Sequence, residues 1–158
     1  MGWGSAEMTE DLIPVRIVAE PRARNGVWCT NPYDGHPKGC PNFPKCPKMF
    51  PDINEIVGNY SWFAVVEEYN LREHVDKMKL AHPDWSERQC RNLLYWQGGV
   101  RKRLREKAKR YVSVGDILLE IPEACGVNVF MTMQLAGITL ERTKPDIVRK
   151  VMLIGKPR

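Results

Sequence analysis

The sequence lacks the features that mark membrane-embedded or secreted proteins. No hydrophobic run approaches the roughly 20 residues of a membrane-spanning helix, and no apolar stretch near the first residue has the form of a secretory signal. We therefore expect a cytoplasmic protein that inserts into no membrane. The chain also has no internal repeat and no linker, so its 158 residues (1–158) are expected to form a single domain. Residues 1–8 have no pattern of their own, and we expect them to be disordered or left from cloning.

The signatures of several enzyme classes are missing as well. There is no phosphate-binding loop of the nucleotide hydrolases, no dinucleotide fingerprint and no nucleophile elbow. Histidine is scarce, with three in the chain. Two of these, His74 and His82, lie in or beside a predicted helix and are interpreted as structural. The sequence therefore names no substrate or reaction, and whether the protein is an enzyme stays open.

Cysteine, in contrast, is concentrated in one segment. The stretch "CTNPYDGHPKGCPNFPKCP", residues 29–47, contains Cys29, Cys40 and Cys46 together with five prolines. Proline removes the N–H donors that helices and sheets need, so we predict a long irregular loop over residues 20–51. Such a loop buries little apolar surface, and something other than a core must offset the entropy of ordering it. Clustered thiols in a reducing compartment indicate metal or redox chemistry rather than a disulfide framework.

An iron–sulfur cluster, 4Fe–4S in its simplest form, is the first candidate for this loop. Cys40 and Cys46 are each followed by proline, as ferredoxin ligands are. A cluster with four protein ligands needs one more thiolate, and we favour Cys90 over Cys125. Cys125 precedes a predicted helix N-terminus, which would stabilise its thiolate. A cluster on three cysteines with one open iron is a further alternative.

Zinc is the competing interpretation. His36 joins Cys29, Cys40 and Cys46 in one loop, and together they supply the Cys₃His set of a tetrahedral structural zinc site. A third interpretation is that these are reduced cysteines in an irregular loop with no metal. Metal analysis of the purified protein separates all three.

Two segments resemble uncharacterised cysteine-rich families described as predicted metal-binding proteins. The segments are "NPYDGHPKGCPNFPKCP" and "PEACGVNVFMTMQLAGI", which lie toward the two ends of the chain. The resemblance implies Cys29, Cys40 and Cys46 as metal ligands and a domain without an assigned reaction. Those families often have further cysteines before the second segment, where this chain has residues 118–121, "LLEI". The resemblance therefore supplies no fourth ligand.

The net charge of +5 is confined to one segment. Residues 101–110, "RKRLREKAKR", contain seven basic residues and one acidic residue, so the rest of the chain sums to −1. This segment predicts a surface for nucleic acid or another polyanion. The residues expected to bind are Arg101, Lys102, Arg103, Arg105 and Lys109. The alternative is a solvated helix face that serves only as scaffold.

Two function classes follow. The first is a metal-centre protein with a redox or sulfur-handling role, acting with an unidentified redox or protein partner. The second is a binding module in which zinc stabilises the loop and the basic helix binds nucleic acid or protein.

Hydrophobic periodicity predicts an α+β fold, a small mixed sheet packed by about three helices. The predicted strands cover residues 12–19, 61–69, 116–121, 138–141 and 147–155. The predicted helices cover residues 71–82, 85–111 and 127–136, and residues 52–59 are expected to form a short helix or turn. The segment 85–111 is expected to form one long helix, with a kink or close contact at Gly98 and Gly99.

Overall fold

The structure is a computed structural model, and it describes residues 12–20, 50–141 and 145–158. Its centre is a four-stranded sheet in the order β1-β2-β4-β3. The strands are β1 (Ile13–Val15), β2 (Tyr60–Asn70), β3 (Ile117–Leu119) and β4 (Ile147–Pro157). The long strands β2 and β4 pair over their whole length, from Tyr60 opposite Pro157 to Asn70 opposite Ile147. The α+β class is confirmed. Every strand pair is antiparallel, whereas the sequence pattern predicted a mixed sheet.

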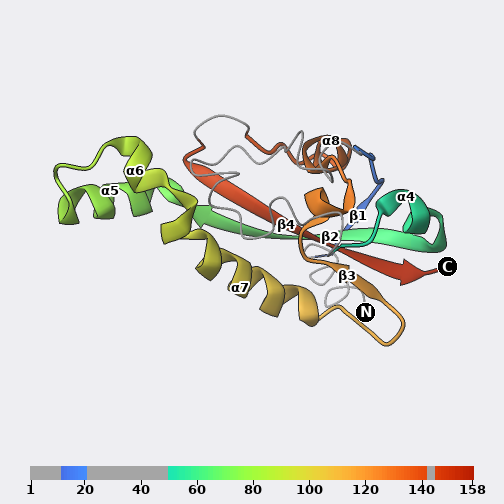
Figure 1. Cartoon of the computed structure of the whole chain (residues 1–158). Helices are drawn as coiled ribbons and strands as arrows, with labels where there is room; N and C mark the ends of the chain where they lie inside the picture. The colour runs from blue at the N-terminus through green and yellow to red at the C-terminus, as the bar shows by residue number, and fades with distance from the viewer. Residues whose placement is uncertain (1–11, 21–49, 142–144) are drawn as a thin grey trace.

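The described part of the chain contains five α-helices and three short 3₁₀ turns. The helices are α4 (Ile53–Ile56), α5 (Leu71–Ala81), α6 (Glu87–Arg91), α7 (Gln97–Lys109) and α8 (Val129–Leu135). The 3₁₀ turns are η1 (Val57–Asn59), η2 (Leu93–Tyr95) and η3 (Pro122–Cys125). Figure 1 shows α7 along one face of the sheet, α4 and α8 on the other, and α5 and α6 beyond the end of the long strands. We call residues 71–96, from α5 to the residue after η2, the end lobe.

The two long strands are rich in β-branched and aromatic residues, which favour a pleated, buried surface. Successive residues of β2 point to opposite faces of the sheet. Trp62 and Ala64 therefore face α8, while Val65 faces α7. In β4 the run from Val151 to Gly155 is buried on both faces, which explains its unbroken apolar sequence.

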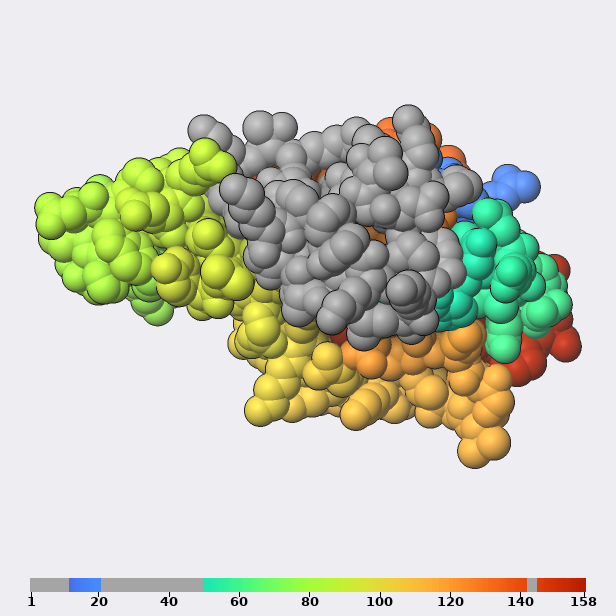
Figure 2. All heavy atoms as spheres, in the orientation of Figure 1, coloured from blue at the N-terminus to red at the C-terminus, as the bar shows by residue number. Residues whose placement is uncertain are grey.

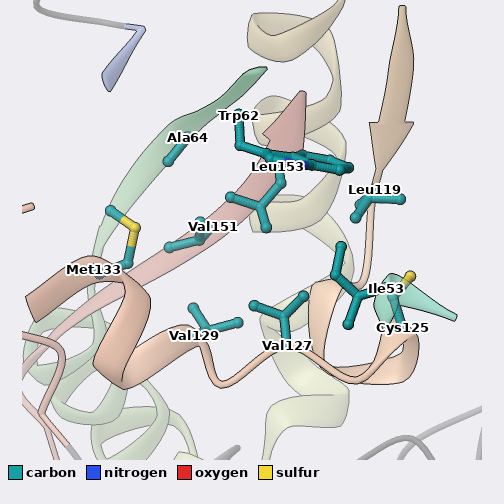
Figure 3. Close-up of a cluster of buried hydrophobic side chains, with 10 residues drawn as sticks. All are labelled: Ile53, Trp62, Ala64, Leu119, Cys125, Val127, Val129, Met133, Val151 and Leu153. Atoms are coloured by element: carbon teal, nitrogen blue, oxygen red, sulfur yellow. The ribbon is translucent and has the colours of Figure 1, made fainter. Parts of the chain in front are cut away.

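Three apolar clusters form the core, and Figure 3 shows the first of them. The α8 core lies between the sheet and α8, with Ile53, Trp62, Ala64, Leu119, Cys125, Val127, Val129, Met133, Val151 and Leu153. The α7 core lies on the other face, with Val65, Leu104, Ala108, Met152 and Ile154. The end core holds the end lobe on the sheet, with Leu71, Val75, Cys90, Leu93, Trp96, Val100 and Val148.

The prediction of one helix over residues 85–111 is wrong. A capping box starts α6, because the Ser86 hydroxyl accepts from the Gln89 amide at 3.2 Å and the Gln89 side chain accepts from the Ser86 amide at 2.8 Å. The helix ends at Asn92, whose ψ of 127° is extended. The indole of Trp96 then donates to the carbonyl of Arg91 at 2.8 Å, which satisfies one backbone acceptor at the break.

The break thus precedes the glycine pair, which lies in the first turn of α7. Gly98 has no neighbouring atom within 4 Å of the position of a Cβ, and Gly99 has the Arg103 guanidinium at 3.5 Å. Neither glycine marks a kink.

The predicted strand over 138–141 is also not formed. The helix α8 ends at Leu135, and Gly137, just after its C-cap, has a φ of +87° that lets the Ile138 amide donate to the carbonyl of Met133 at 2.9 Å. Ile138 and Leu140 then pack against the α8 core as an irregular segment. The other predicted strands and helices are present, with boundaries shifted by a few residues.

Candidate functional site

The predicted metal ligands Cys29, His36, Cys40 and Cys46 lie outside the described residues. The described chain on the N-terminal side of this segment is held tightly by α8 and the turn before it. The Val18 amide donates to the Thr132 hydroxyl at 3.0 Å, and the Val18 carbonyl accepts from the Asn128 amide at 2.7 Å. The Glu20 amide donates to the Gly126 carbonyl at 2.6 Å. The chain therefore enters the cysteine-rich segment directly beside Cys125.

The described chain on the C-terminal side returns to the same place. Phe50 packs against the α8 core, and Ile53 is fully buried in it. The Asp52 carboxylate accepts from the Asn54 amide at 3.0 Å and caps α4. Figure 3 shows Cys125 beside Ile53 in this core. Both ends of the cysteine-rich segment therefore meet at the cluster that contains Cys125.

Cys90, the favoured fourth ligand, lies in a different cluster. It is fully buried in the end core, on α6. The two cores are separated along β2, because Ala64 belongs to the α8 core and Leu71, just after the strand, to the end core. The structure thus places the two candidate thiols in separate cores, Cys125 beside the sheet under α8 and Cys90 beyond the end of the long strands.

The imidazole of His74 lies beside the backbone of Cys90. Burial lowers the pKa of His74 below its usual value, and a hydrogen bond with the Cys90 backbone opposes that shift. Its Nε2 atom is buried and has no hydrogen-bond partner. Within the described ranges, no three His, Cys, Asp or Glu side chains gather into a group that would hold a metal ion.

The basic segment 101–110 forms most of α7. Val100, Leu104 and Ala108 face the sheet and are buried. Among the described residues, four cations of this helix have no ion pair: Arg101, Lys102, Lys109 and Arg110. Lys102, Lys109 and Arg110 are exposed, and Arg101 is half-buried at the edge of the packed stripe.

The other cations on the helix have protein partners. Arg103 Nε lies 3.5 Å from a Glu67 carboxylate oxygen on one flank, and Arg105 forms an ion pair with Glu120 on the other. Lys107 donates to the carbonyl of Val66 at 2.8 Å. Two of the five predicted polyanion-binding residues, Arg103 and Arg105, therefore already have carboxylate partners within the protein. The free cations also include Arg110, which belongs to the basic segment but not to the five residues expected to bind.

A second feature of the surface, an aromatic cluster at the end lobe, was not predicted. The ring of His82 stacks on Trp85 with centroids 3.9 Å apart and planes at 9°. Tyr95 meets Trp85 with centroids 5.4 Å apart and planes at 33°. These residues are separated in sequence by a turn and a helix, and their meeting depends on the unpredicted break before α7.

A hollow of about 700 Å³ lies beside the second half of β2. It is lined by Val66, Glu67, Glu68, Lys107, Gly137, Ile138, Thr139 and Arg149. Its charged groups largely neutralise one another, since Arg149 Nε lies 2.9 Å from Glu68 and Arg103 reaches Glu67. We assign no ligand to it.

Comparisons with known proteins supply no relative. No family model matches the chain, and neither the curated proteins nor the solved structures contain a significant match. Within the described ranges, the helices are too short or too polar to cross a bilayer.

Proposed function

We propose that the protein binds a metal centre, an iron–sulfur cluster ahead of zinc, through Cys29, Cys40 and Cys46, and that this centre has a redox or sulfur-handling role. The donor set supports this proposal, because three closely spaced thiolates and their proline-rich surroundings suit a cluster. The observation that carries it is the anchoring of both ends of the cysteine-rich segment at the α8 core. Because the flanking residues on both sides are held at the same core, the cysteines between them can contribute to a single metal site.

The same anchoring favours Cys125 over Cys90 as the fourth ligand. Phe50 is four positions after Cys46, and an extended chain spans at most about 3.6 Å per residue, which is about 14 Å. Phe50 packs against the core that contains Cys125. Cys90 lies in the end core, which neither Glu20 nor Phe50 joins. Cys125 is thus the thiol nearer to the two anchored ends.

Metal and sulfide analysis of anaerobically purified protein tests the proposal. We expect brown protein with broad visible absorption, and loss of both iron and colour in Cys40→Ser and Cys46→Ser variants. Colourless protein with one zinc per chain would replace the cluster with the Cys₃His site that includes His36. Folded protein without metal would overturn both interpretations.

Matched variants of the two buried cysteines test the fourth ligand. We expect Cys125→Ala to lower the cluster content and Cys90→Ala to leave it unchanged. Each removes one buried thiol, so their costs in stability are comparable and thermal unfolding provides the control. Loss of the cluster in Cys90→Ala alone would reverse the assignment.

A second candidate function is polyanion binding by α7. The specific observation is the set of four cations without ion pairs on one helix. About four phosphate contacts predict a slope near −3 to −4 in a log–log plot of duplex affinity against salt. The matched variant changes Lys102, Lys109 and Arg110 to Glu and retains the paired Arg103 and Arg105. A flat salt dependence would exclude this function.

A further inference from the structure

The aromatic cluster of the end lobe presents ring surface to solvent. Tyr95 is 52% exposed, and His82 is also exposed. Trp85 lies between them, packs against the end core and keeps the two outer rings in place. The Lys79 ammonium donates to the Trp85 carbonyl and fixes the turn that carries it. The next residue to Tyr95, Leu94, is 67% exposed. This is a rigid apolar surface on a part of the protein that projects from the sheet.

The free cations of α7 continue from this surface along the chain. Tyr95 precedes the first residue of α7 by two positions, and Arg101 and Lys102 follow in the second turn. Lys109 and Arg110 stand at the far end of the helix, about 10–12 Å along its axis from Lys102 at 1.5 Å per residue. In Figure 2 the end lobe and α7 form one continuous strip of the visible surface.

The glycine pair lies between the rings and the cations. Gly98 and Gly99 are exposed, and no atom lies within 4 Å of a Cβ position at Gly98. The surface is therefore open at Gly98, while the guanidinium of the paired Arg103 lies 3.5 Å from the Cβ position of Gly99. Glycine is unfavourable in a helix, so a role for open surface here accounts for a pair that the fold alone does not require.

We propose that the end lobe and α7 together bind single-stranded nucleic acid. The inference rests on the second candidate function, the polyanion surface of α7, and adds the strand type. Phosphates suit the four unpaired cations, and unpaired bases suit the exposed faces of Tyr95 and His82. A duplex keeps its bases stacked within itself and so gains nothing from the rings. An acidic protein partner would complement the charges but would not need planar rings.

Asp84, next to Trp85, provides a further test of single-strand binding. It is exposed and has no ion pair among the described residues, so it opposes phosphate at the edge of the rings. The other acids of the end lobe have cationic partners: Glu87 pairs with Arg72 and Arg91, Glu73 with Lys77, and Asp76 with Arg72. The change Asp84→Asn should therefore raise affinity for a single strand by a few-fold at low salt.

Fluorescence anisotropy with the full chain tests the proposal. The probes are a single strand of about 12 nucleotides, as RNA and as DNA, and the duplex of the same sequence, each at two salt concentrations. We expect the native protein to prefer the single strands. The double variant His82→Ala with Tyr95→Ala should bind them about tenfold or more weakly, with duplex binding unchanged. Tyr95→Phe keeps the ring and should retain native affinity.

Two controls separate the inference from the function on which it rests. Leu135→Ala removes an exposed apolar side chain, 60% exposed, from α8 on the other face, and should change nothing. The variant with Lys102, Lys109 and Arg110 changed to Glu should weaken single-strand and duplex binding alike. If binding is salt-dependent but the affinity for single strands is unchanged by the loss of both rings, the inference is overturned while the polyanion function of α7 is retained. Absence of salt-dependent binding to any probe would overturn both, and binding only to a protein partner would overturn the choice of ligand.

Discussion

The centre of the sheet and the end lobe are stabilised in different ways. At the centre, apolar side chains fill both faces of β2 and β4, and the α8 and α7 cores bury residues such as Leu153 and Ile154 completely. The end lobe has a smaller core and depends in addition on ion pairs around Arg91. The centre should therefore respond to changes in volume, and the end lobe to changes in charge.

The end lobe is tied to the start of β4 by a polar network. Arg91 has a side chain only 5% exposed, and it donates to the Pro145 carbonyl at 2.8 Å and to Asp146 at 3.2 Å. Arg72 reaches the same Asp146 oxygen at 3.1 Å and Glu87 at 2.8 Å. These contacts join residues far apart in sequence, and they fix the helices that carry the aromatic cluster.

The largest effect is expected from a cavity at the centre of the sheet. Leu153→Ala removes a fully buried side chain from the α8 core and should lower the free energy of unfolding by about 2–5 kcal/mol. Chemical denaturation measures it. The control Leu135→Ala, on the exposed side of α8, should cost little. A small loss from Leu153→Ala would mean that the core is loosely packed and would weaken the contrast with the end lobe.

A close contact at Gly155 should give the next largest effect. A Cβ there would lie 2.7 Å from Ile117 Cγ2 and 2.9 Å from Trp62 Cζ3, so Gly155→Ala overpacks the sheet and should cost about 2–3 kcal/mol. Gly98→Ala is the matched change in the open first turn of α7, and it should stabilise by about 0.4–1 kcal/mol. Changes of the same sign in the free energy of unfolding for Gly155→Ala and Gly98→Ala would contradict this packing.

The charge network of the end lobe should give a smaller and more local effect. Arg91→Ala removes the donor to the Pro145 carbonyl and should cost about 1–2 kcal/mol. We expect amide hydrogen exchange to rise in α5 and α6 and to stay slow in β4. Uniform acceleration across the sheet would show that the end lobe does not open separately.

Lowering the pH should destabilise the end lobe, and we expect this loss of stability to be the smallest of the effects considered. The hydrogen bond from Arg72 is the largest cause that lowers the pKa of both Asp146 and Glu87. Lowered pKa values mean stability that is present above the ordinary carboxyl pKa values, near pH 4, and is lost as pH falls through the folded values.

Two indole N–H signals can report this change by NMR. The indole of Trp96 donates within the end lobe, and the indole of Trp62 donates to the Val57 carbonyl at 3.0 Å beside the sheet. We expect the Trp96 signal to shift at a higher pH than the Trp62 signal. Asp116, whose pKa is lowered by a hydrogen bond from Lys156, adds an acid-sensitive pair at the sheet, and Asp116→Asn provides the control. If the Trp96 and Trp62 signals shift at the same pH, both in the native protein and in the Asp116→Asn control, the end lobe does not open separately from the sheet.

Local pattern predicted most of the regular elements correctly. Residues 61–69 predicted β2 because they are rich in β-branched and aromatic residues. Residues 147–155 predicted β4 because they contain an uninterrupted apolar run, which is buried on both faces. The stripe of Val100, Leu104 and Ala108 correctly predicted the packed face of α7. It failed before α7, because the spacing of Trp85, Leu93 and Trp96 fits a continuous helix as well as two helices joined by a turn.

The candidate sites show the same division. Residue type alone made the cysteine-rich segment a metal site hypothesis and residues 101–110 a basic surface, since thiolate and guanidinium chemistry needs no fold to be recognised. The partners of Arg103 and Arg105, and the separation of Cys90 from Cys125, required the tertiary structure. Glu67 and Glu120 reach α7 from opposite flanks, and no local spacing encodes that.

The sequence by itself determined the fold class, the two long strands and the positions where charge and thiols are concentrated, because burial pattern and residue chemistry are evident from local composition. Only the tertiary structure decided which cations remain unpaired, which cysteine lies by the ends of the cysteine-rich segment, and that His82, Trp85 and Tyr95 meet. Each of these depends on contacts between segments that are distant in sequence and that the fold brings together. Such contacts leave no periodic pattern in the sequence.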